Sequence, residues 1–399
     1  MTLHQKSAHP LLRHRDGHHA RVTFEELLFD LVYVFAVTQL SHALLHHLSL
    51  VGIIETVILW FAVWLGWQYT CWVTNWFDPE TPAMRAVIFA IMVPALLMAA
   101  SIPEAFGSRG LIFAITYVTI QVGRTAFIVL QLAGDHPLAP NFRRMLAWLV
   151  ISASLWIGGG FAEGEVRILL WMIAALCEYV SPMFGFALPG FGRSSTSDWT
   201  IEGGHLAERC QLFAIVALGE TLLASGAVLA EADSWNASIL SALLATFLGT
   251  IAMWWLYFGT AGKDAANVVT RSNDPGRIGA YFHYIHAILV AGIIATAVGN
   301  DLVVAHPGGS LSTAYVLTMI AGPIFYLFGC ILYKKVVYKI IPKSHIVGVL
   351  LLMALAPIAY ISNLLVTGWL TTAVLLGVGF IEGHVYRRHR AKHSAVAKH

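Results

Sequence analysis

Charged residues occur in two stretches of the sequence that are otherwise apolar and nearly long enough to cross a bilayer. The first, FEELLFDLVYVFAVTQLSHALLHH, carries Glu26 and Asp30 four residues apart, on one face of a helix. The second, HLAERCQLFAIVALGETLLASG, carries Arg209 and Glu220, which an interval of eleven residues returns to nearly the same face. Ionisable side chains in membrane helices are typical of ion-binding sites, proton relays and interhelical ion pairs.

An unpaired charge at the centre of a bilayer costs at least about 2.5 kcal/mol, so these side chains are expected to face the interior of a helical bundle. Arg209 lies at about the depth of the acidic pair on the first helix, and we expect it to pair with Glu26 or Asp30. Glu208 lies beside the face that carries Arg209. These four residues belong to one expected transport or intramembrane polar site, which also includes Glu220, His283 and His286.

Two further sets of polar residues lie in apolar stretches. Arg124 and Glu178 are at similar depths and are expected to form a structural ion pair between their helices. Glu220 is left without an obvious cationic partner, which makes it the residue expected to load a proton or bind a cation. His283 and His286, in YFHYIHAILVAG, are its expected neighbours. The alternative is that all these charges only hold helices together.

The composition indicates which elements must carry these residues. Of 399 residues, 58% are apolar and only 12% are charged, whereas soluble domains carry roughly a quarter. Continuous apolar runs of about twenty residues predict an all-α bundle of membrane-spanning helices. We expect about twelve, over residues 24–46, 51–76, 83–101, 110–134, 143–160, 166–189, 207–230, 237–261, 279–299, 312–333, 345–362 and 367–383.

Weak similarity between the two halves predicts a repeat of six helices related by a twofold axis along the membrane normal. The expected organisation is a polar, histidine-rich tail (1–22), a first six-helix half (23–190), a linker (191–204), a second half (205–384) and a basic tail (385–399). The repeat makes the first and seventh helices structural partners.

Basic residues are distributed unequally between the two ends of the expected helices. If the N-terminus is cytoplasmic, 20 of the 24 lysines and arginines fall on the cytoplasmic side, as the positive-inside rule requires. We therefore expect a multi-pass protein of the bacterial inner membrane with both termini in the cytoplasm and anionic lipid against its basic loops and tail. The polar N-terminus does not have the form of a cleavable signal peptide.

Other function classes find little support in the sequence. The four cysteines are scattered singly and the eighteen histidines follow no ligand spacing, so neither a metal site nor a disulfide framework is expected. No spacing of nucleophile, base or cofactor motif is present, so we expect no catalytic residues, no cofactor and no enzyme activity. Nucleic acid is not an expected partner, and a homo-oligomer stays open.

The two charged stretches, together with WQYTCWVTNWFD, AASIPEAFG, LWMIAALCEYVSP and YFHYIHAILVAGIIATAVG, resemble the bacterial low temperature requirement A family. The resemblance covers nearly the whole chain between the tails. It implies a multi-pass inner-membrane protein and a link to growth in the cold, and no particular substrate or reaction.

We therefore expect a transporter or channel for a small ion or solute that uses its intramembrane charges. The alternative is a structural or envelope-stress membrane protein that transports nothing. The sequence leaves open the substrate, proton coupling, the choice between channel and carrier, the oligomeric state and the physiological role.

Overall fold

The computed structural model describes most of the chain. The described residues are 9–15, 20–132, 136–196, 199, 201–259, 268, 272 and 274–396, with the backbone alone from 385 onward. Parts of both expected tails, residues 1–8, 16–19 and 397–399, therefore lie outside the described residues.

The described residues fold into twelve helices with no strand, which confirms the expected all-α bundle. One of the twelve is the continuous segment made of α4, η2 and α5, and the short 3₁₀ turn η1 (Ile102–Glu104) extends α3. The bounds are α1 (Phe24–His46), α2 (Leu50–Trp76), α3 (Pro82–Ser101), α4 (Gly110–Val118), η2 (Thr119–Gly123), α5 (Arg124–Gln131), α6 (Ala139–Phe161), α7 (Gly164–Met183), α8 (Gly203–Glu231), α9 (Ala237–Phe258), α11 (Pro275–Ala305), α12 (Thr313–Val337), α13 (Lys343–Ala359) and α14 (Leu364–Val396).

Eleven of the described helices are long and apolar enough to cross a membrane. The remaining one, α13, is apolar but has only 17 residues, which is at the lower end of the usual range for a spanning helix. The chain is therefore a membrane protein whose helices contact the lipid bilayer. Which side of the membrane each terminus faces stays a prediction.

The chain divides into two compact units. Unit 1 contains residues 1–43, 53–209 and 269–280, and unit 2 contains residues 44–52, 210–268 and 281–399. The boundary between Arg209 and Cys210 falls inside α8, so the first turns of that helix belong to unit 1. The expected six-helix halves and their symmetry stay a prediction.

In unit 1, α6 packs against both α4 and α7, and α3 packs against α4. The helix that contains α4 and α5 is widened at η2, a π-helical turn over Thr119–Gly123. Threonine hydroxyls bond to backbone carbonyls on both sides of this turn: Thr119 bonds to Ile115 O at 2.8 Å, and Thr125 to Gln121 O at 2.7 Å. Such side-chain bonds to the backbone are common where the regular helical ladder is altered. The π-turn carries Gln121, whose side chain belongs to a buried polar cluster of this unit.

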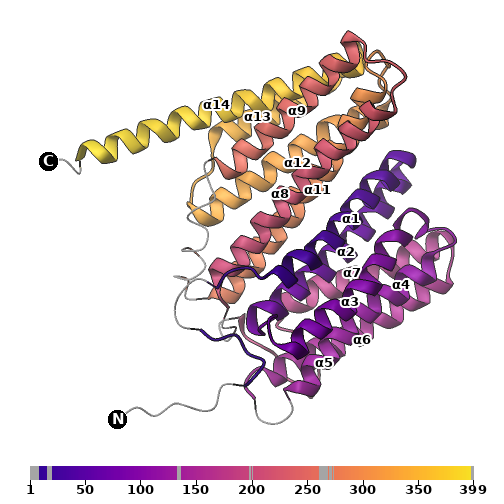
Figure 1. Cartoon of the computed structure of the whole chain (residues 1–399), viewed down its shortest axis with the longest axis vertical. Coiled ribbons are helices and arrows are strands. Elements are labelled where there is room, and N and C mark those ends of the chain that lie inside the picture. Colours follow the sequence, from indigo (N-terminus) through magenta and orange to yellow (C-terminus); the bar gives the residue numbers. More distant parts are fainter. Residues whose placement is uncertain are drawn as a thin grey trace. The chain divides into compact units, whose positions relative to one another are not determined.

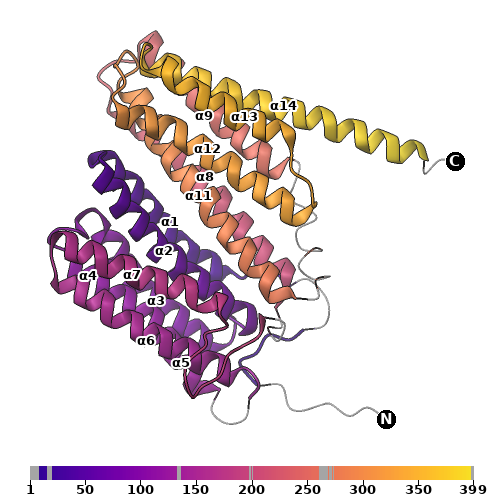
Figure 2. The same ribbon diagram turned by 180° about the vertical axis from the view of Figure 1, so that it is seen from behind.

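In unit 2, α9, α13 and α14 lie side by side in both views of the ribbon (Figure 1, Figure 2). Helices α11 and α12 approach closely because glycines lie between them. A Cβ atom on Gly292 would lie 2.5 Å from Tyr326 N, and one on Gly322 would lie 2.6 Å from Thr296 N. Small residues of this kind let membrane helices pack with their backbones nearly in contact.

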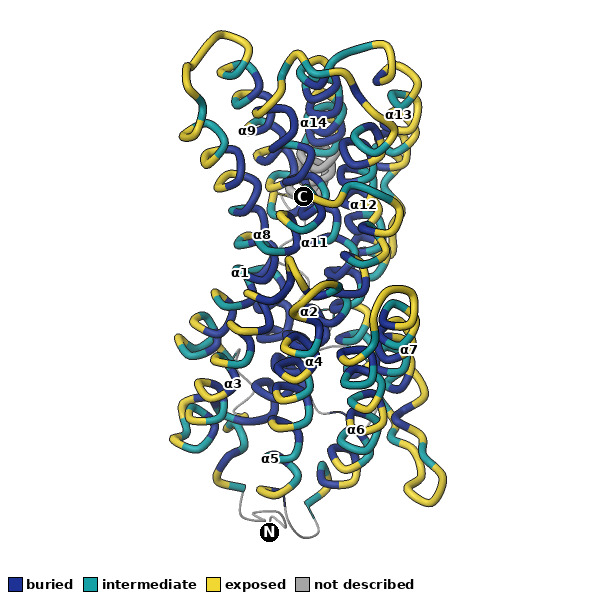
Figure 3. The backbone as a smooth tube through the Cα atoms, turned by 90° about the vertical axis from the view of Figure 1, so that its right-hand side faces the viewer, coloured by how far each residue is buried: buried dark blue, intermediate teal, exposed yellow. Residues whose placement is uncertain are grey.

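Buried and exposed residues alternate around the helices of both units (Figure 3). On α3, for example, Val93, Leu96 and Leu97 are exposed while Met84 and Met98 are fully buried. Apolar side chains on an outer face are expected where the surrounding solvent is lipid.

Candidate functional site

The centre of the polar site in unit 1 is Arg209, on the part of α8 that belongs to this unit. Its Nη1 donates to Glu26 Oε1 at 2.8 Å and its Nη2 donates to Asp30 Oδ1 at 2.5 Å. All three side chains are buried, with Arg209 0% and Glu26 1% exposed. Arg209 therefore bridges the two acids between which the sequence left the choice open.

Glu26 is held in place by the start of α1. Thr23 N donates to Glu26 Oε2 at 2.9 Å and Glu26 N donates to Thr23 Oγ1 at 3.4 Å, which is the reciprocal arrangement of a capping box. Arg13 Nη2 donates to the same Oε2 at 2.9 Å. Glu26 thus has a second cationic partner, supplied by the segment before the first helix.

Asp30 is held by a tryptophan of α2 as well as by Arg209. Trp67 Nε1 donates to Asp30 Oδ1 at 2.7 Å, and the Arg209 guanidinium lies 5.8 Å from the centroid of the Trp67 ring. Both donors use the same oxygen of Asp30. Among the described residues, no hydrogen-bond partner is found for the other oxygen, Oδ2, or for Nε of Arg209, and both atoms are buried.

His205 closes the site on the side of α8 nearest its N-terminus. Asn75 accepts a hydrogen bond from Glu202 N at 2.9 Å and donates to Glu202 O at 2.8 Å, which defines which end of the amide is the donor. The same Asn75 Nδ2 lies 3.1 Å from His205 Nδ1, so Nδ1 is the acceptor and Nε2 carries the proton. His205 Nε2 then donates to Glu26 Oε1 at 2.9 Å, and Arg13 Nη2 lies 3.2 Å from the same nitrogen.

The charges of this site balance. Arg13 and Arg209 supply two positive charges, and Glu26 and Asp30 supply two negative charges. A balanced cluster tolerates burial because its members neutralise one another. The cluster therefore has no net charge that would attract an additional ion. An ion or proton could bind here only by displacing one of the existing partners.

A second buried cluster in unit 1 surrounds Glu178 on α7. Its Oε1 accepts hydrogen bonds from Ser152 at 2.7 Å and Trp156 at 2.9 Å. Its Oε2 accepts from Tyr117 and, at 3.3 Å, from Gln121. Glu178 is therefore a carboxylate solvated by neutral donors from the helices around it.

The expected direct ion pair between Arg124 and Glu178 is corrected by this arrangement. Arg124 Nη2 donates to Gln121 Oε1 at 2.5 Å and Arg124 Nη1 donates to Thr70 Oγ1 at 2.8 Å. The amide of Gln121 thus lies between the guanidinium and the carboxylate, because the π-turn presents Gln121 toward both. The two charges are joined by a relay rather than by a salt bridge.

The other expected site residues lie elsewhere. Glu208 is half-buried beside Arg209, and Glu220 is 2% exposed in unit 2. His283 and His286 are fully buried on α11. His286 lies 2.5 Å from the Tyr257 hydroxyl and 2.6 Å from Phe282 O, so neither of its hydrogen bonds joins it to Glu220.

Two residues of functional interest are missed by the sequence patterns. In the sequence, Arg13 indicates only which side of the membrane the N-terminus lies on. In the structure, its side chain donates a hydrogen bond to Glu26. Asp301, on α11, is 4% exposed, and among the described residues its Oδ1 is buried without a hydrogen-bond partner. Its signal is an acidic residue two positions after an expected span that ends at 299. Among the described residues, no group of three or more His, Cys, Asp and Glu side chains is arranged to hold a metal ion.

Comparisons with known proteins identify a family and a relative that this chain resembles. The family model described as bacterial low temperature requirement A protein (LtrA) matches residues 21–380. A curated relative, "Uncharacterized protein RA0937" of Rhizobium meliloti (strain 1021), is 36% identical over 392 residues, which cover 96% of this chain and 94% of that protein. No solved structure matches.

Proposed function

This chain belongs to the bacterial low temperature requirement A family, and we propose that it moves a small ion or solute across the membrane through its buried charged residues. The membrane is proposed to be the bacterial inner membrane, with both termini in the cytoplasm and anionic lipid at the basic cytoplasmic face. No enzyme activity is proposed.

The observation that carries the proposal is the incomplete hydrogen bonding of the Asp30 and Arg209 pair. Asp30 Oδ2 and Arg209 Nε are buried and have no hydrogen-bond partner in the part of the chain that the structure describes, although the two side chains are in contact. A buried polar atom without a partner costs about 1–3 kcal/mol, and a cluster that serves only to join helices would be expected to satisfy both atoms. The two atoms offer an acceptor and a donor to a species that passes the site.

The geometry indicates how such a species would act. A proton or cation that reaches Asp30 Oδ2 competes with Arg209 for the charge of the carboxylate. Arg209 keeps its bond to Glu26 Oε1 at 2.8 Å, so it stays placed while its contact with Asp30 loosens. An anion would instead meet Arg209 Nε. The bridge between the two acids is therefore the element that transport would open and reset.

The charge balance of the same cluster favours one competing function, a structural membrane protein with no transport. Two arginines and two acids neutralise one another, and Trp67 and His205 add hydrogen bonds that fix their geometry. In that case, substitutions would lower stability without changing any flux. The two functions are distinguished by measuring both properties on the same variants.

The proposal is tested by reconstituting the protein in liposomes and measuring proton, potassium and organic-anion flux for wild type and Asp30→Asn. We expect wild type to exceed empty vesicles for at least one of the three, and the variant to fall toward the empty-vesicle rate. Flux equal to that of empty vesicles for all three would favour the structural function.

A further inference from the structure

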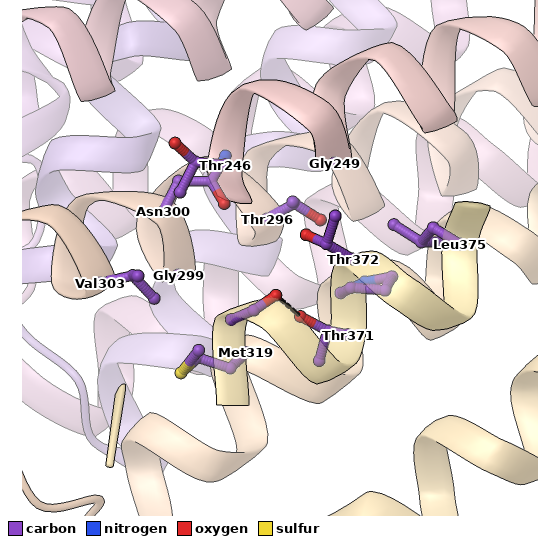
Figure 4. Close-up of a pocket in the computed structure, with 12 residues that line it drawn as sticks. Thr246, Gly249, Thr296, Gly299, Asn300, Val303, Met319, Thr371, Thr372 and Leu375 are labelled. Atoms are coloured by element: carbon purple, nitrogen blue, oxygen red, sulfur yellow. Dashed lines mark hydrogen bonds between the residues drawn. The ribbon is translucent and has the colours of Figure 1, made fainter. Parts of the chain in front are cut away.

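A small cavity lies inside unit 2, where α9, α11, α12 and α14 line it (Figure 4). Its volume, measured as the space open to the centre of a water molecule, is about 20 Å³. A water molecule needs roughly 10–15 Å³ on this measure, so the cavity can hold one molecule of that size. The residues that line it belong neither to the Arg209 cluster nor to the Glu178 cluster.

Three of the four helices place a glycine at the wall of the cavity. Gly249 lies on α9, Gly299 on α11 and Gly368 on α14. A Cβ atom on Gly249 would lie 3.0 Å from Thr372 Oγ1, and one on Gly368 would lie 3.1 Å from Val303 Cγ1. A larger residue at these positions would therefore occupy space beside the wall.

Threonine hydroxyls supply hydrogen-bond acceptors to the cavity. Four buried threonines line it, and the hydroxyl of each donates to a backbone carbonyl. The bonds are Thr246 to Leu243 O at 3.0 Å, Thr296 to Gly292 O at 2.7 Å, Thr371 to Gly368 O at 3.0 Å (dashed in Figure 4) and Thr372 to Ala245 O at 3.0 Å. Because each hydroxyl hydrogen is already used, the threonine oxygens are available as acceptors.

The backbone of α12 adds another acceptor. Pro323 lies within this helix and has no N–H, so it cannot donate to the carbonyl of Met319, four residues before it. Both residues line the cavity. Met319 O is therefore a wall carbonyl without its regular helical donor.

Asn300 supplies a donor. It lies on α11, four residues after Thr296 and hence on the same face of the helix. Its Nδ2 is buried and has no hydrogen-bond partner among the described residues. The cavity thus combines an unused donor with several acceptors, and the described residues that line it include no Asp, Glu, Lys, Arg or His.

This combination distinguishes between classes of ligand. A cation would meet the partial positive charge of Asn300 Nδ2 and would find no carboxylate in the wall to balance its charge. An anion would meet mostly oxygen acceptors, whose partial charges repel it. An uncharged molecule that both donates and accepts hydrogen bonds fits the donor and the acceptors together.

We propose that this cavity is a binding site for one water molecule, which accepts a hydrogen bond from Asn300 Nδ2 and donates to threonine oxygens of the wall. A buried water typically forms about three hydrogen bonds and replaces partners that the protein itself does not supply. Such bonds re-form when the water turns, so the four helices can shift slightly while Asn300 keeps a partner. The site goes beyond the proposed function and does not depend on ion transport by the Arg209 cluster.

X-ray radiolytic footprinting of the full chain in lipid nanodiscs tests the site. Irradiated water forms a hydroxyl radical, which adds to a neighbouring methionine sulfur; dissolved oxygen then takes up one hydrogen atom and leaves the sulfoxide. Met319 is the reporter because it lines the cavity. Met253 is its internal control, because it is fully buried on α9 in the same unit and is not part of the lining. Peptide mass spectrometry measures the rate of oxidation at each.

We expect Met319 to be oxidised severalfold faster than Met253. Asn300→Leu removes the donor at similar size and should lower the rate at Met319 severalfold, while Thr371→Val removes one acceptor and should lower it less. Thr318→Val is the matched control, because Thr318 is a buried threonine of α12 outside the lining and donates to Ala314 O. It should leave the rate unchanged. Equal rates at Met319 and Met253 in the wild type would overturn the site.

The same measurement in choline, sodium and potassium buffers separates water from a cation. The rate at Met319 should be the same in all three, because the wall favours an uncharged ligand. A lower rate in sodium or potassium would show that an alkali-metal ion takes the place of the water, and would overturn the assignment. Fast oxidation of Met319 in a protein that shows no flux would keep this site and overturn the proposed function alone.

Discussion

Arg209 Nη2 lies 2.5 Å from Asp30 Oδ1, yet the second carboxylate oxygen of Asp30 has no hydrogen-bond partner among the described residues. The pair is therefore strong but incomplete. Its strength makes the α1–α8 contact important for stability, and its spare atoms make it a place where an ion can exchange. The first property predicts what happens when Arg209 is removed.

Arg209→Ala should lower the free energy of unfolding by about 3–5 kcal/mol, because Glu26 and Asp30 then lose the positive charge that bridges them. SDS-induced unfolding in bicelles measures the change. Arg209→Lys keeps the positive charge but lacks the forked guanidinium that donates to both acids. It should therefore lower the free energy of unfolding by less than Arg209→Ala does. Equal losses for the two variants would show that a positive charge without the fork geometry stabilises nothing, and would contradict the role assigned to the charge.

The Glu178 cluster predicts a difference between two serines of α6. Ser152 donates to Glu178 Oε1, whereas Ser154 donates only to the backbone of its own helix and is exposed. Ser152→Ala should lower the free energy of unfolding by about 1.5–3 kcal/mol, as expected for a hydrogen bond to a charged group. Ser154→Ala is the matched control and should change it little. A similar effect of the two substitutions would contradict the assigned role of Ser152.

The close approach of α11 and α12 predicts that Gly292 tolerates no larger side chain. Gly292→Ala would bring a methyl group within 2.5 Å of Tyr326 N and would force the two helices apart. We expect it to lower the free energy of unfolding by about 1–3 kcal/mol. Gly226, on α8, serves as the control because a methyl group added there would meet no atom within 4 Å. Gly226→Ala should be neutral or slightly stabilising. The apparent Tm of each variant in detergent, compared with that of the wild type, measures the difference between the two substitutions.

The short helix α13 decides on which side of the membrane the C-terminal tail lies. If its 17 residues cross, fusions after Ile341 and Gly383 are cytoplasmic and a fusion after Ser362 is on the outer side. Green fluorescent protein should then fluoresce in the first two positions, and alkaline phosphatase should be active in the third. Fluorescence of a fusion after Ser362 would show that α13 does not cross and would reverse the expected location of the tail.

The helices could be predicted because their determinants are local. The thickness of the bilayer sets how long an apolar run must be to cross it, so such runs can be recognised in the sequence. Helix α1, for example, begins and ends at the predicted residues, 24 and 46. For α11 the sequence predicts too early an end, because Asn300 and Asp301 interrupt the apolar run. The structure continues the helix to Ala305 and buries Asp301, since helix neighbours rather than water surround it.

The side-chain contacts were less predictable because they depend on how each helix is rotated about its axis. Residue depth brought Arg209 to the acids of α1, but it could not show that Gln121 would lie between Arg124 and Glu178. Nor could it show that Arg13 would fold back onto Glu26, because a polar segment has no periodicity that reveals its path. The sequence therefore identified most of the charged groups and fewer of their partners.

The most direct test of the central claim is the initial rate of ion flux into proteoliposomes for Asp30→Asn. Asparagine keeps an oxygen for Trp67 and Arg209 and removes the negative charge. Glu25→Gln is the matched control, because Glu25 pairs with the partly exposed Arg85 outside the cluster. We expect Asp30→Asn to abolish the wild-type flux and Glu25→Gln to keep it, with both variants folded. Wild-type flux in Asp30→Asn would contradict the claim that this buried carboxylate serves transport.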